Sequence, residues 1–135
     1  MAFVWTTRIY QPTKDMPLTI VSSNKDSVHL RLSATLSKGI AEACKYEIYY
    51  RFGIDMSGHK IALMFQGKKG RDWRKAKIDP EGRISAYFHV TPLRVTEKDI
   101  KGHYPDFHFD KTDQMWVADI QKRVDLGKRG DLLAD

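Results

Sequence analysis

Apolar and polar residues alternate over much of this chain. The alternation is clearest in five segments, residues 3–10, 28–33, 48–54, 61–65 and 83–90. A period of two places successive side chains on opposite faces of a strand. Each segment is therefore expected to form a strand with one buried face. Residues 18–21 add a short apolar run ahead of the second segment.

Turn sequences between these segments predict β-hairpins. Asp55–Gly58 separates two alternating arms in residues 48–65, and this is the strongest structural signal in the chain. Asp79–Gly82 contains proline and glycine, and it is expected to join a second pair of strands. A third hairpin is expected over residues 103–119, with its turn at Asp110–Asp113.

Two short helical segments are also expected. Apolar residues recur at helical spacing after the second alternating segment, at Leu36, Ile40, Ala43 and Cys44. Ser37 is expected to cap this helix, and Gly39 near its start weakens it. At Thr96, an acidic residue three positions later, Asp99, predicts one further helical turn.

These elements predict one α+β domain over residues 1–120. We expect seven or eight mostly antiparallel strands, one or two short helices, and a curled sheet or a partly open barrel. Residues 121–135 are expected to form a charged tail that is either a frayed helix or disordered. A length of 135 residues suits a single core without disulfide staples.

Composition narrows the class of protein. The hydrophobic fraction is 41% and the charged fraction is 30%, as in ordinary globular proteins. Cys44 is the single cysteine, which excludes an internal disulfide and a cysteine zinc site and fits a reducing cytoplasm. No run approaches the length of a membrane span, so a cytoplasmic protein without a membrane partner is expected.

The charge is basic and unevenly distributed. The chain has 23 Lys and Arg against 17 Asp and Glu, a formal net charge of +6. Residues 67–77 hold six basic side chains and one acidic one, whereas residues 95–119 hold three basic and six acidic ones. Such a surplus favours acidic partners, most commonly nucleic acid.

The basic segment is the first candidate site. Six cationic residues surround Trp73, namely Lys68, Lys69, Arg71, Arg74, Lys75 and Lys77. Cationic side chains bind phosphates with release of counterions, and an aromatic ring among them can stack on an unpaired base. The alternative is a solvated loop whose Trp73 folds back onto the core.

Other candidate chemistry is weaker. Asp106, His108 and Asp110 would share one face of a strand and could hold a divalent metal, or they could simply be the polar face and turn of a hairpin. Cys44 falls on the apolar stripe of a helix, where a free cysteine is usually a core residue. The chain has no phosphate-binding glycine loop and no nucleophile-elbow motif. We therefore expect a protein that is not an enzyme and that uses no cofactor and no catalytic metal.

Residues 28–65 resemble one family of regulators. The order is a strand at Leu30–Ser33, a short helix at Leu36–Ala43 and the hairpin Ile48–Phe65. This order is similar to the swapped-hairpin domain of AbrB and antitoxin-type regulators. The resemblance implies a homodimer with interleaved hairpins and adds DNA contacts at Arg31, Lys38 and Arg51. The compact chain also resembles small phage or mobile-element proteins.

Three hypotheses follow. The first is a nucleic-acid-binding regulatory or accessory protein, with DNA favoured over RNA, that uses the basic segment. The second is an interaction module, such as a phage-encoded inhibitor or adaptor, that docks on a host protein through an apolar patch around Tyr49, Trp73 or Tyr87. The third is a metal-dependent hydrolase or nuclease built on Asp106 and its neighbours.

Overall fold

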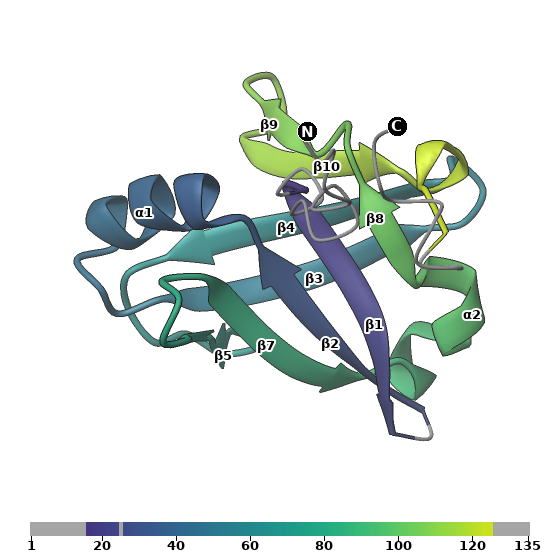
Figure 1. The fold of residues 1–135 in the computed structure, drawn as a ribbon, viewed down its shortest axis with the longest axis horizontal. Coiled ribbons are helices and arrows are strands. Elements are labelled where there is room, and N and C mark those ends of the chain that lie inside the picture. Colours follow the sequence, from purple (N-terminus) through teal and green to yellow (C-terminus); the bar gives the residue numbers. More distant parts are fainter. Residues whose placement is uncertain (1–15, 25, 126–135) are drawn as a thin grey trace, which may run out of the picture.

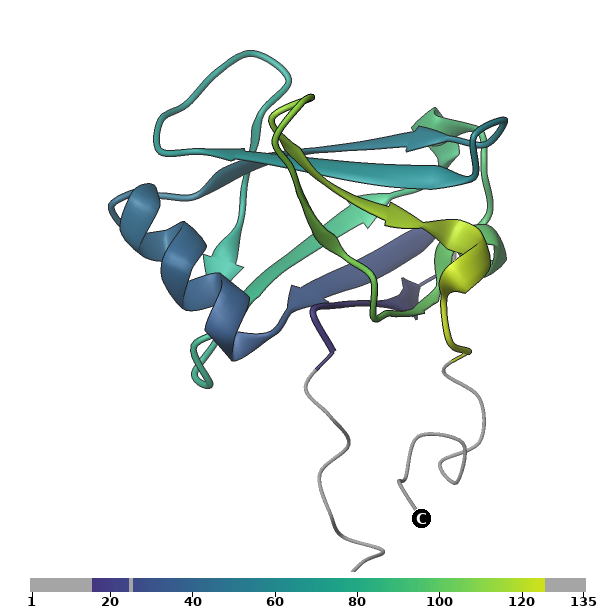
Figure 2. The same cartoon turned by 90° about the horizontal axis from the view of Figure 1, so that it is seen from above.

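Two antiparallel five-stranded sheets pack face to face in the computed structural model, which describes residues 16–24 and 26–125 (Figures 1 and 2). The expected strand at residues 3–10 lies outside the described residues. The first sheet has the order β6 (Lys77–Ile78), β7 (Ile84–His89), β2 (Ser27–Leu32), β1 (Leu18–Asn24) and β8 (Gly102–Tyr104). The second sheet has the order β5 (Arg74–Lys75), β3 (Tyr49–Asp55), β4 (Lys60–Gln66), β10 (Met115–Asp119) and β9 (His108–Asp110).

The core lies between the two sheets. In longer strands such as β2 and β4, alternate residues point inward, so the expected period of two is realised there as one buried and one outward face. The largest fully buried side chains include Leu30, Ile61 and Tyr104. Across the core, the rings of Phe52 and Phe88 pack with their centroids 4.7 Å apart. The strand-rich α+β architecture predicted from the sequence is confirmed.

The described chain crosses between the sheets three times, once through α1 (Ala34–Ala43) and twice at tight corners. At the first corner, Ala76 separates β5 of the second sheet from β6 of the first, and its N–H donates to the carbonyl of Ile48 at 2.9 Å. At the second, the buried Phe107 lies between β8 and β9. His103 of β8 also pairs with Val124, after the last 3-10 helix. The described strands thus form a sandwich with connected corners and not a closed barrel.

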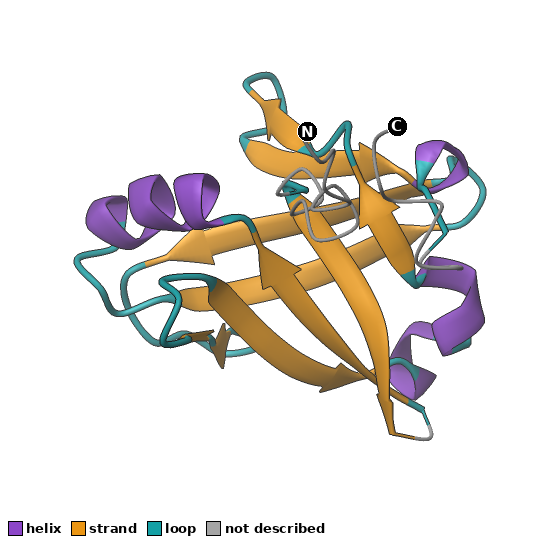
Figure 3. Cartoon of the chain, in the orientation of Figure 1, coloured by secondary structure: helices purple, strands orange, loops and turns teal. Residues whose placement is uncertain are grey.

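Short helices occupy the ends of the sandwich (Figure 3). They are α1 (Ala34–Ala43), η2 (Thr91–Leu93), α2 (Glu97–Ile100) and η3 (Ile120–Lys122), and α1 and α2 lie at opposite ends. Within the described part of the chain, no helix has the length and apolarity needed to cross a bilayer.

The predicted cap of α1 is wrong by one turn. Ser33, not Ser37, is the N-cap, and its side chain accepts a hydrogen bond from the N–H of Leu36 at 3.2 Å. Because Ser33 follows β2 directly, the helix begins as soon as the strand ends. The predicted turn at Thr96 is confirmed, and Thr96 and Asp99 form a capping box.

The hairpins are found where turn residues predicted them, with two corrections. β3 and β4 pair around Asp55–Gly58, and β9 and β10 pair around Asp110–Asp113. His103, however, belongs to β8, which pairs with β1 in the other sheet. The composition of residues 67–75 predicts a loop, but Lys75 lies in β5 opposite Tyr49, so the loop that follows β4 is shorter than predicted.

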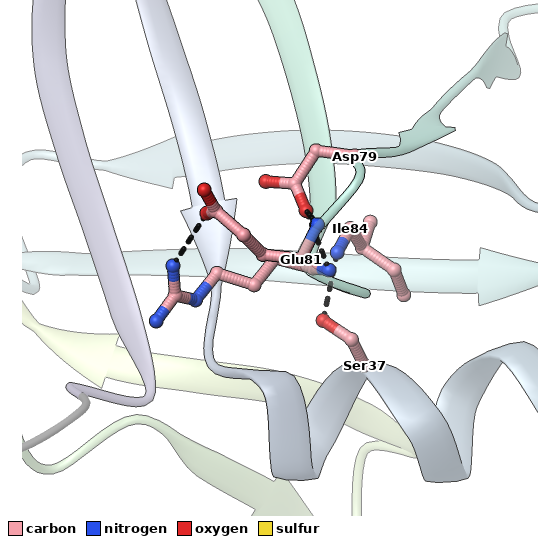
Figure 4. Close-up of polar contacts among 5 residues, drawn as sticks. Ser37, Asp79, Glu81 and Ile84 are labelled. Carbon is pink, nitrogen blue, oxygen red and sulfur yellow. Dashed lines mark hydrogen bonds and ion pairs between the residues drawn. The ribbon is translucent and has the colours of Figure 1, made fainter.

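Side-chain hydrogen bonds hold the turn between β6 and β7 (Figure 4). Asp79 Oδ1 accepts from the N–H groups of Glu81 and Arg83, both at 2.9 Å. The Arg83 guanidinium contacts the Glu81 carboxylate at 2.9 Å. Ser37 Oγ accepts from the N–H of Ile84 at 2.7 Å and so joins α1 to the start of β7. These contacts fix the edge of the first sheet that carries Lys77.

Candidate nucleic-acid interface

Residues 67–73 form the basic loop between β4 and β5, which is exposed except for its partly covered tryptophan. Lys68, Lys69 and Arg71 are exposed, and none of them forms an ion pair with another described residue. Trp73 is half-buried, and its backbone N–H donates to the carbonyl of Gly70 at 3.1 Å. A Cβ placed on Gly70 would lie 2.8 Å from Trp73 Cδ1, so this ring lies against the loop's own backbone.

The rest of the basic segment forms the corner between the sheets. Arg74 and Lys75 make up β5, and Lys77 opens β6, with the buried Ala76 between them. Lys75 pairs with Tyr49 on the second sheet, whereas Lys77 pairs with Ser85 on the first. The corner therefore directs cations to the outer faces of both sheets.

The three contacts implied by the regulator resemblance lie on three different surfaces. Arg31 is exposed on β2 of the first sheet, and Arg51 is exposed on β3 of the second. Lys38 is exposed on α1. The structure therefore brings Arg31 and Lys77 onto one sheet but leaves Arg51 and Lys38 elsewhere.

Strand pairing places Lys77 and Arg31 in one row across the first sheet. Lys77 pairs with Ser85, Ser85 with Arg31, Arg31 with Thr19, and Thr19 with His103. Directly paired residues project from the same face of a sheet. We call these five residues the cross-sheet row. Since strands lie roughly 4.8 Å apart, its two cations and its imidazole are spaced roughly 10 Å from one to the next.

An aromatic pair lies beside the cross-sheet row, two residues along the strands. The imidazole of His29 and the ring of Tyr87 are stacked, with centroids 4.3 Å apart and planes 12° from parallel. Tyr87 is 58% exposed, so much of its ring faces solvent. Val21 pairs with His29 and continues this apolar strip onto β1.

The residues of the cross-sheet row that lie between Lys77, Arg31 and His103 have small, polar side chains. Ser85 and Thr19 are buried, with 9% and 7% of their surfaces accessible. Thr19 Oγ1 lies 2.8 Å from His103 Nδ1, and this contact fixes the imidazole on the edge strand. Arg31 and Lys77 form no ion pair with another described residue, so both charges are available to a ligand.

Both histidines of this face have lowered pKa values. Burial, and secondly the positive charge of Arg31, lower the pKa of His29 and of His103 below the ordinary value near 6.5. For His29, the Asp79 carboxylate opposes the shift. Both imidazoles are therefore mainly neutral at pH 7, and a phosphate bound beside them would favour their protonated forms.

The residues proposed as metal ligands do not converge. Asp106 Oδ2 accepts from the N–H of Asp119 at 3.2 Å, and Asp110 Oδ1 accepts from the N–H of Thr112 at 2.9 Å. His108 Nδ1 contacts the carbonyl of Asp106 at 2.6 Å. Among the described residues, no group of three or more His, Cys, Asp or Glu side chains is placed to hold a metal ion. The Asp110 carboxylate caps the hairpin turn, whereas Asp106 contacts the end of β10 through Oδ2 and leaves its buried Oδ1 without a partner among the described residues.

The apolar patch expected for a protein partner is only partly present. Tyr87 is exposed as expected, but Tyr49 is buried, with 6% of its surface accessible, and Trp73 is half-buried. Cys44 is buried, and burial raises the pKa of its thiol, which makes it a poor nucleophile.

His29, His103 and Tyr87 were not predicted from the sequence as residues of a nucleic-acid interface, and Tyr87 was considered only for a protein-docking patch. The alternation of residues 28–33 placed His29 and Arg31 on one outward face, and that signal was available. No sequence pattern predicts that β2 pairs with β7, and this pairing brings Tyr87 beside His29.

Comparisons with family models, with curated proteins and with solved structures find no match for this chain.

Proposed function

We propose that this protein binds single-stranded nucleic acid across the outer face of the first sheet. One observation carries the proposal: strand pairing sets Arg31 and Lys77 in a row beside the exposed ring of Tyr87, which stacks on the half-buried His29. Cations that contact phosphates and rings that stack on bases are the two elements of single-strand recognition on a sheet.

The cross-sheet row is the proposed phosphate track. Lys77 and Arg31 are exposed cations two strands apart, and the hydroxyl of Ser85 lies between them. Hydroxyl and cationic donors are both common partners of phosphate oxygens. His103 at the far edge adds an imidazole, and a bound phosphate would favour the protonated form of this ring.

The aromatic pair is the proposed base platform. Stacking on an exposed ring needs an unpaired base, because the bases of a duplex are already stacked on each other. The exposed part of Tyr87 is therefore suited to a single strand, and His29 holds its ring in a fixed plane. The row therefore offers contacts to phosphates, and the platform beside it offers a stacking contact to one base.

The basic loop has a second role in this proposal. Lys68, Lys69 and Arg71 lie in the loop that leads through β5 to Lys77, so they extend the positive potential beyond the sheet. Trp73 is half-buried and is not assigned to base stacking. We infer that the loop raises the association rate and overall affinity, whereas the sheet face selects single strands.

The test is fluorescence anisotropy with a labelled 12-nucleotide single-stranded RNA, the matching single-stranded DNA and the DNA duplex, at two salt concentrations. Both single strands are expected to bind more tightly than the duplex. Tyr87→Ala should weaken single-strand binding about 5- to 150-fold, since base stacking contributes about 1–3 kcal/mol. Tyr87→Phe keeps the ring and should bind like the wild type.

Charge variants separate the row from the rest of the surface. Arg31→Gln and Lys77→Gln should each reduce the slope of log affinity against log salt by about one. Arg51→Gln, on the other sheet, removes the same charge and should have the smaller effect. The proposal fails if the duplex binds best, if Tyr87→Ala binds like the wild type, or if only changes at Lys68, Lys69 and Arg71 reduce binding.

A further inference from the structure

A cavity of about 350 Å³ lies between α1 and the β9–β10 hairpin, against the second sheet. Its volume falls within the range of sites that bind small molecules. Residues from α1, β4, β9 and β10 and the adjoining turns line it: Thr35, Leu36, Gly39, Ile40, Ala43, Cys44, Met64, Phe65, Phe109, Gln114, Met115 and Trp116. None of these residues is Lys, Arg, His, Asp or Glu.

Aromatic rings and thioethers dominate the walls. Phe109 and Trp116 meet edge to face with their centroids 5.5 Å apart. Phe109 is 39% exposed and Met64 is 38% exposed, so both side chains border the opening. Met115 supplies a second flexible thioether. Thioethers adapt to the shape of a ring and make favourable sulfur–aromatic contacts.

Small residues of α1 keep the cavity open on the helix side. Thr35, Gly39 and Ala43 are spaced four residues apart, so they share one stripe of the helix. A Cβ added to Gly39 would meet nothing within 4 Å outside the helix's own backbone. Glycine in a helix interior costs about 1 kcal/mol relative to alanine, and no close contact at Gly39 requires it.

Two polar side chains at the cavity are available to a ligand, the Thr35 hydroxyl and the exposed amide of Gln114. Gln114 Nε2 donates to the carbonyl of Lys111 at 2.7 Å, which fixes the orientation of the side-chain amide. The Gln114 Oε1 atom accepts no hydrogen bond from another described residue. An amide oxygen accepts from hydroxyl and N–H donors.

We propose that this cavity binds a small, neutral aromatic molecule that carries one hydrogen-bond donor, such as a phenol or an indole. The uncharged lining offers a charged ligand no partner, so it favours a neutral one. The ring would pack among Phe65, Phe109 and Trp116, and its donor would reach Gln114. This site shares no residue with the cross-sheet row, so it stands or falls independently of nucleic-acid binding.

The test uses the whole protein with ¹³C-labelled methionine methyl groups and 2-naphthol as the probe. The methyl signals of Met64 and Met115 are expected to shift saturably, with a Kd below about 1 mM. The signal of Met56, in the turn between β3 and β4 and outside the cavity lining, is expected to stay unchanged. 2-Naphthoate has the same ring system with a negative charge, and it should bind at least about tenfold more weakly at high salt.

Filling the cavity gives a matched pair of variants. Gly39→Leu places a side chain in the proposed site and should weaken 2-naphthol binding at least about tenfold. Gly53→Leu adds the same atoms on β3, where a Cβ also meets nothing within 4 Å, and should leave binding unchanged. Ala43→Leu is a second filling variant that keeps the conclusion independent of glycine's helix propensity.

Four results would overturn the proposal. The first is that the methyl signals do not move with 2-naphthol. The second is that Gly39→Leu and Ala43→Leu both bind 2-naphthol as tightly as the wild type. The third is that 2-naphthoate binds as tightly as 2-naphthol. The fourth is a shift of the Met64 and Met115 signals with protein concentration alone, which would make a second copy of the chain the occupant.

Discussion

Ser37 accepts a hydrogen bond of 2.7 Å from the backbone N–H of Ile84, a residue 47 positions later in the chain. Both residues are buried, with 1% of Ser37 and none of Ile84 accessible to solvent. Ile84 opens β7, the strand that carries Tyr87. A serine in the middle of α1 therefore sets the position of the strand on which the proposed base platform depends.

Ser37→Ala is expected to destabilise the fold by about 1–3 kcal/mol, because it leaves a buried backbone N–H without an acceptor. Urea denaturation followed by circular dichroism measures this change. Thr35→Ala, on the same helix, is a suitable control, since the Thr35 side chain makes no hydrogen bond to another described residue. It should stay within about 0.5 kcal/mol of the wild type. Equal stability of the two variants would contradict a structural role for the Ser37 hydroxyl.

The pKa values of His29 and His103 should both be below the ordinary value near 6.5, and Arg31→Gln should raise both. NMR titration of the imidazole C–H signals measures them. Arg51→Gln is the control, because Arg51 lies on the other sheet. Single-stranded RNA should also raise the pKa of His103 if phosphate lies beside it.

The same shifts predict how stability depends on pH. A lowered pKa in the folded state means that the unfolded chain takes up protons first as the pH falls. The stabilising contribution of neutral His29 and His103 is therefore complete above about pH 6.5 and is lost as the pH falls from there through their folded pKa values. His103→Asn should flatten this part of the profile, and an unchanged slope between about pH 6.5 and 5 would refute the assignment.

Gly67→Ala is expected to destabilise the protein by about 1–3 kcal/mol. A Cβ on Gly67 would lie 2.8 Å from the backbone oxygen of Cys44, and that oxygen cannot move without shifting the end of α1. Gly53→Ala should be neutral or slightly stabilising, because a Cβ at Gly53 meets nothing within 4 Å. Thermal denaturation compares the two, and a neutral Gly67→Ala would show that the loop adjusts without cost.

Cys44 should react slowly with thiol reagents while the protein is folded. The side chain is buried, and burial raises its pKa, so both access and thiolate content are low. At pH 8 its reaction with a disulfide reagent is expected to be at least about tenfold slower than in urea. Equal rates in the two conditions would mean that α1 opens readily from the second sheet.

Local signals in the sequence were sufficient to predict the strands, turns and helices, but not which strands pair with each other. The Asp55–Gly58 turn and the Thr96–Asp99 capping box involve residues close in sequence, and both are found as expected. By contrast, β1 pairs with β8, some 80 residues later, and the alternation of a strand carries no information on its partner. His103 was placed in the wrong hairpin for this reason.

The candidate site shows the same division. Charge clustering identified Lys68 to Lys77, yet their strands and loop direct these side chains to several surfaces. Arg31 and Lys77 share a surface only because β7 lies between their strands, and Tyr87 comes from that intervening strand. A site assembled from cross-strand pairs becomes visible only once the register is known.

The corner at Ala76 has a consequence for how the molecule opens. This buried alanine donates its N–H to Ile48 and connects β5 directly to β6. The two sheets therefore cannot move apart unless β5 detaches from β3 or β6 detaches from β7. Amide hydrogen exchange should therefore report one cooperative unit, with the slowest amides in β2 and β4 losing protection together. If the amides of β2 and β4 lost protection independently, the two sheets would unfold separately.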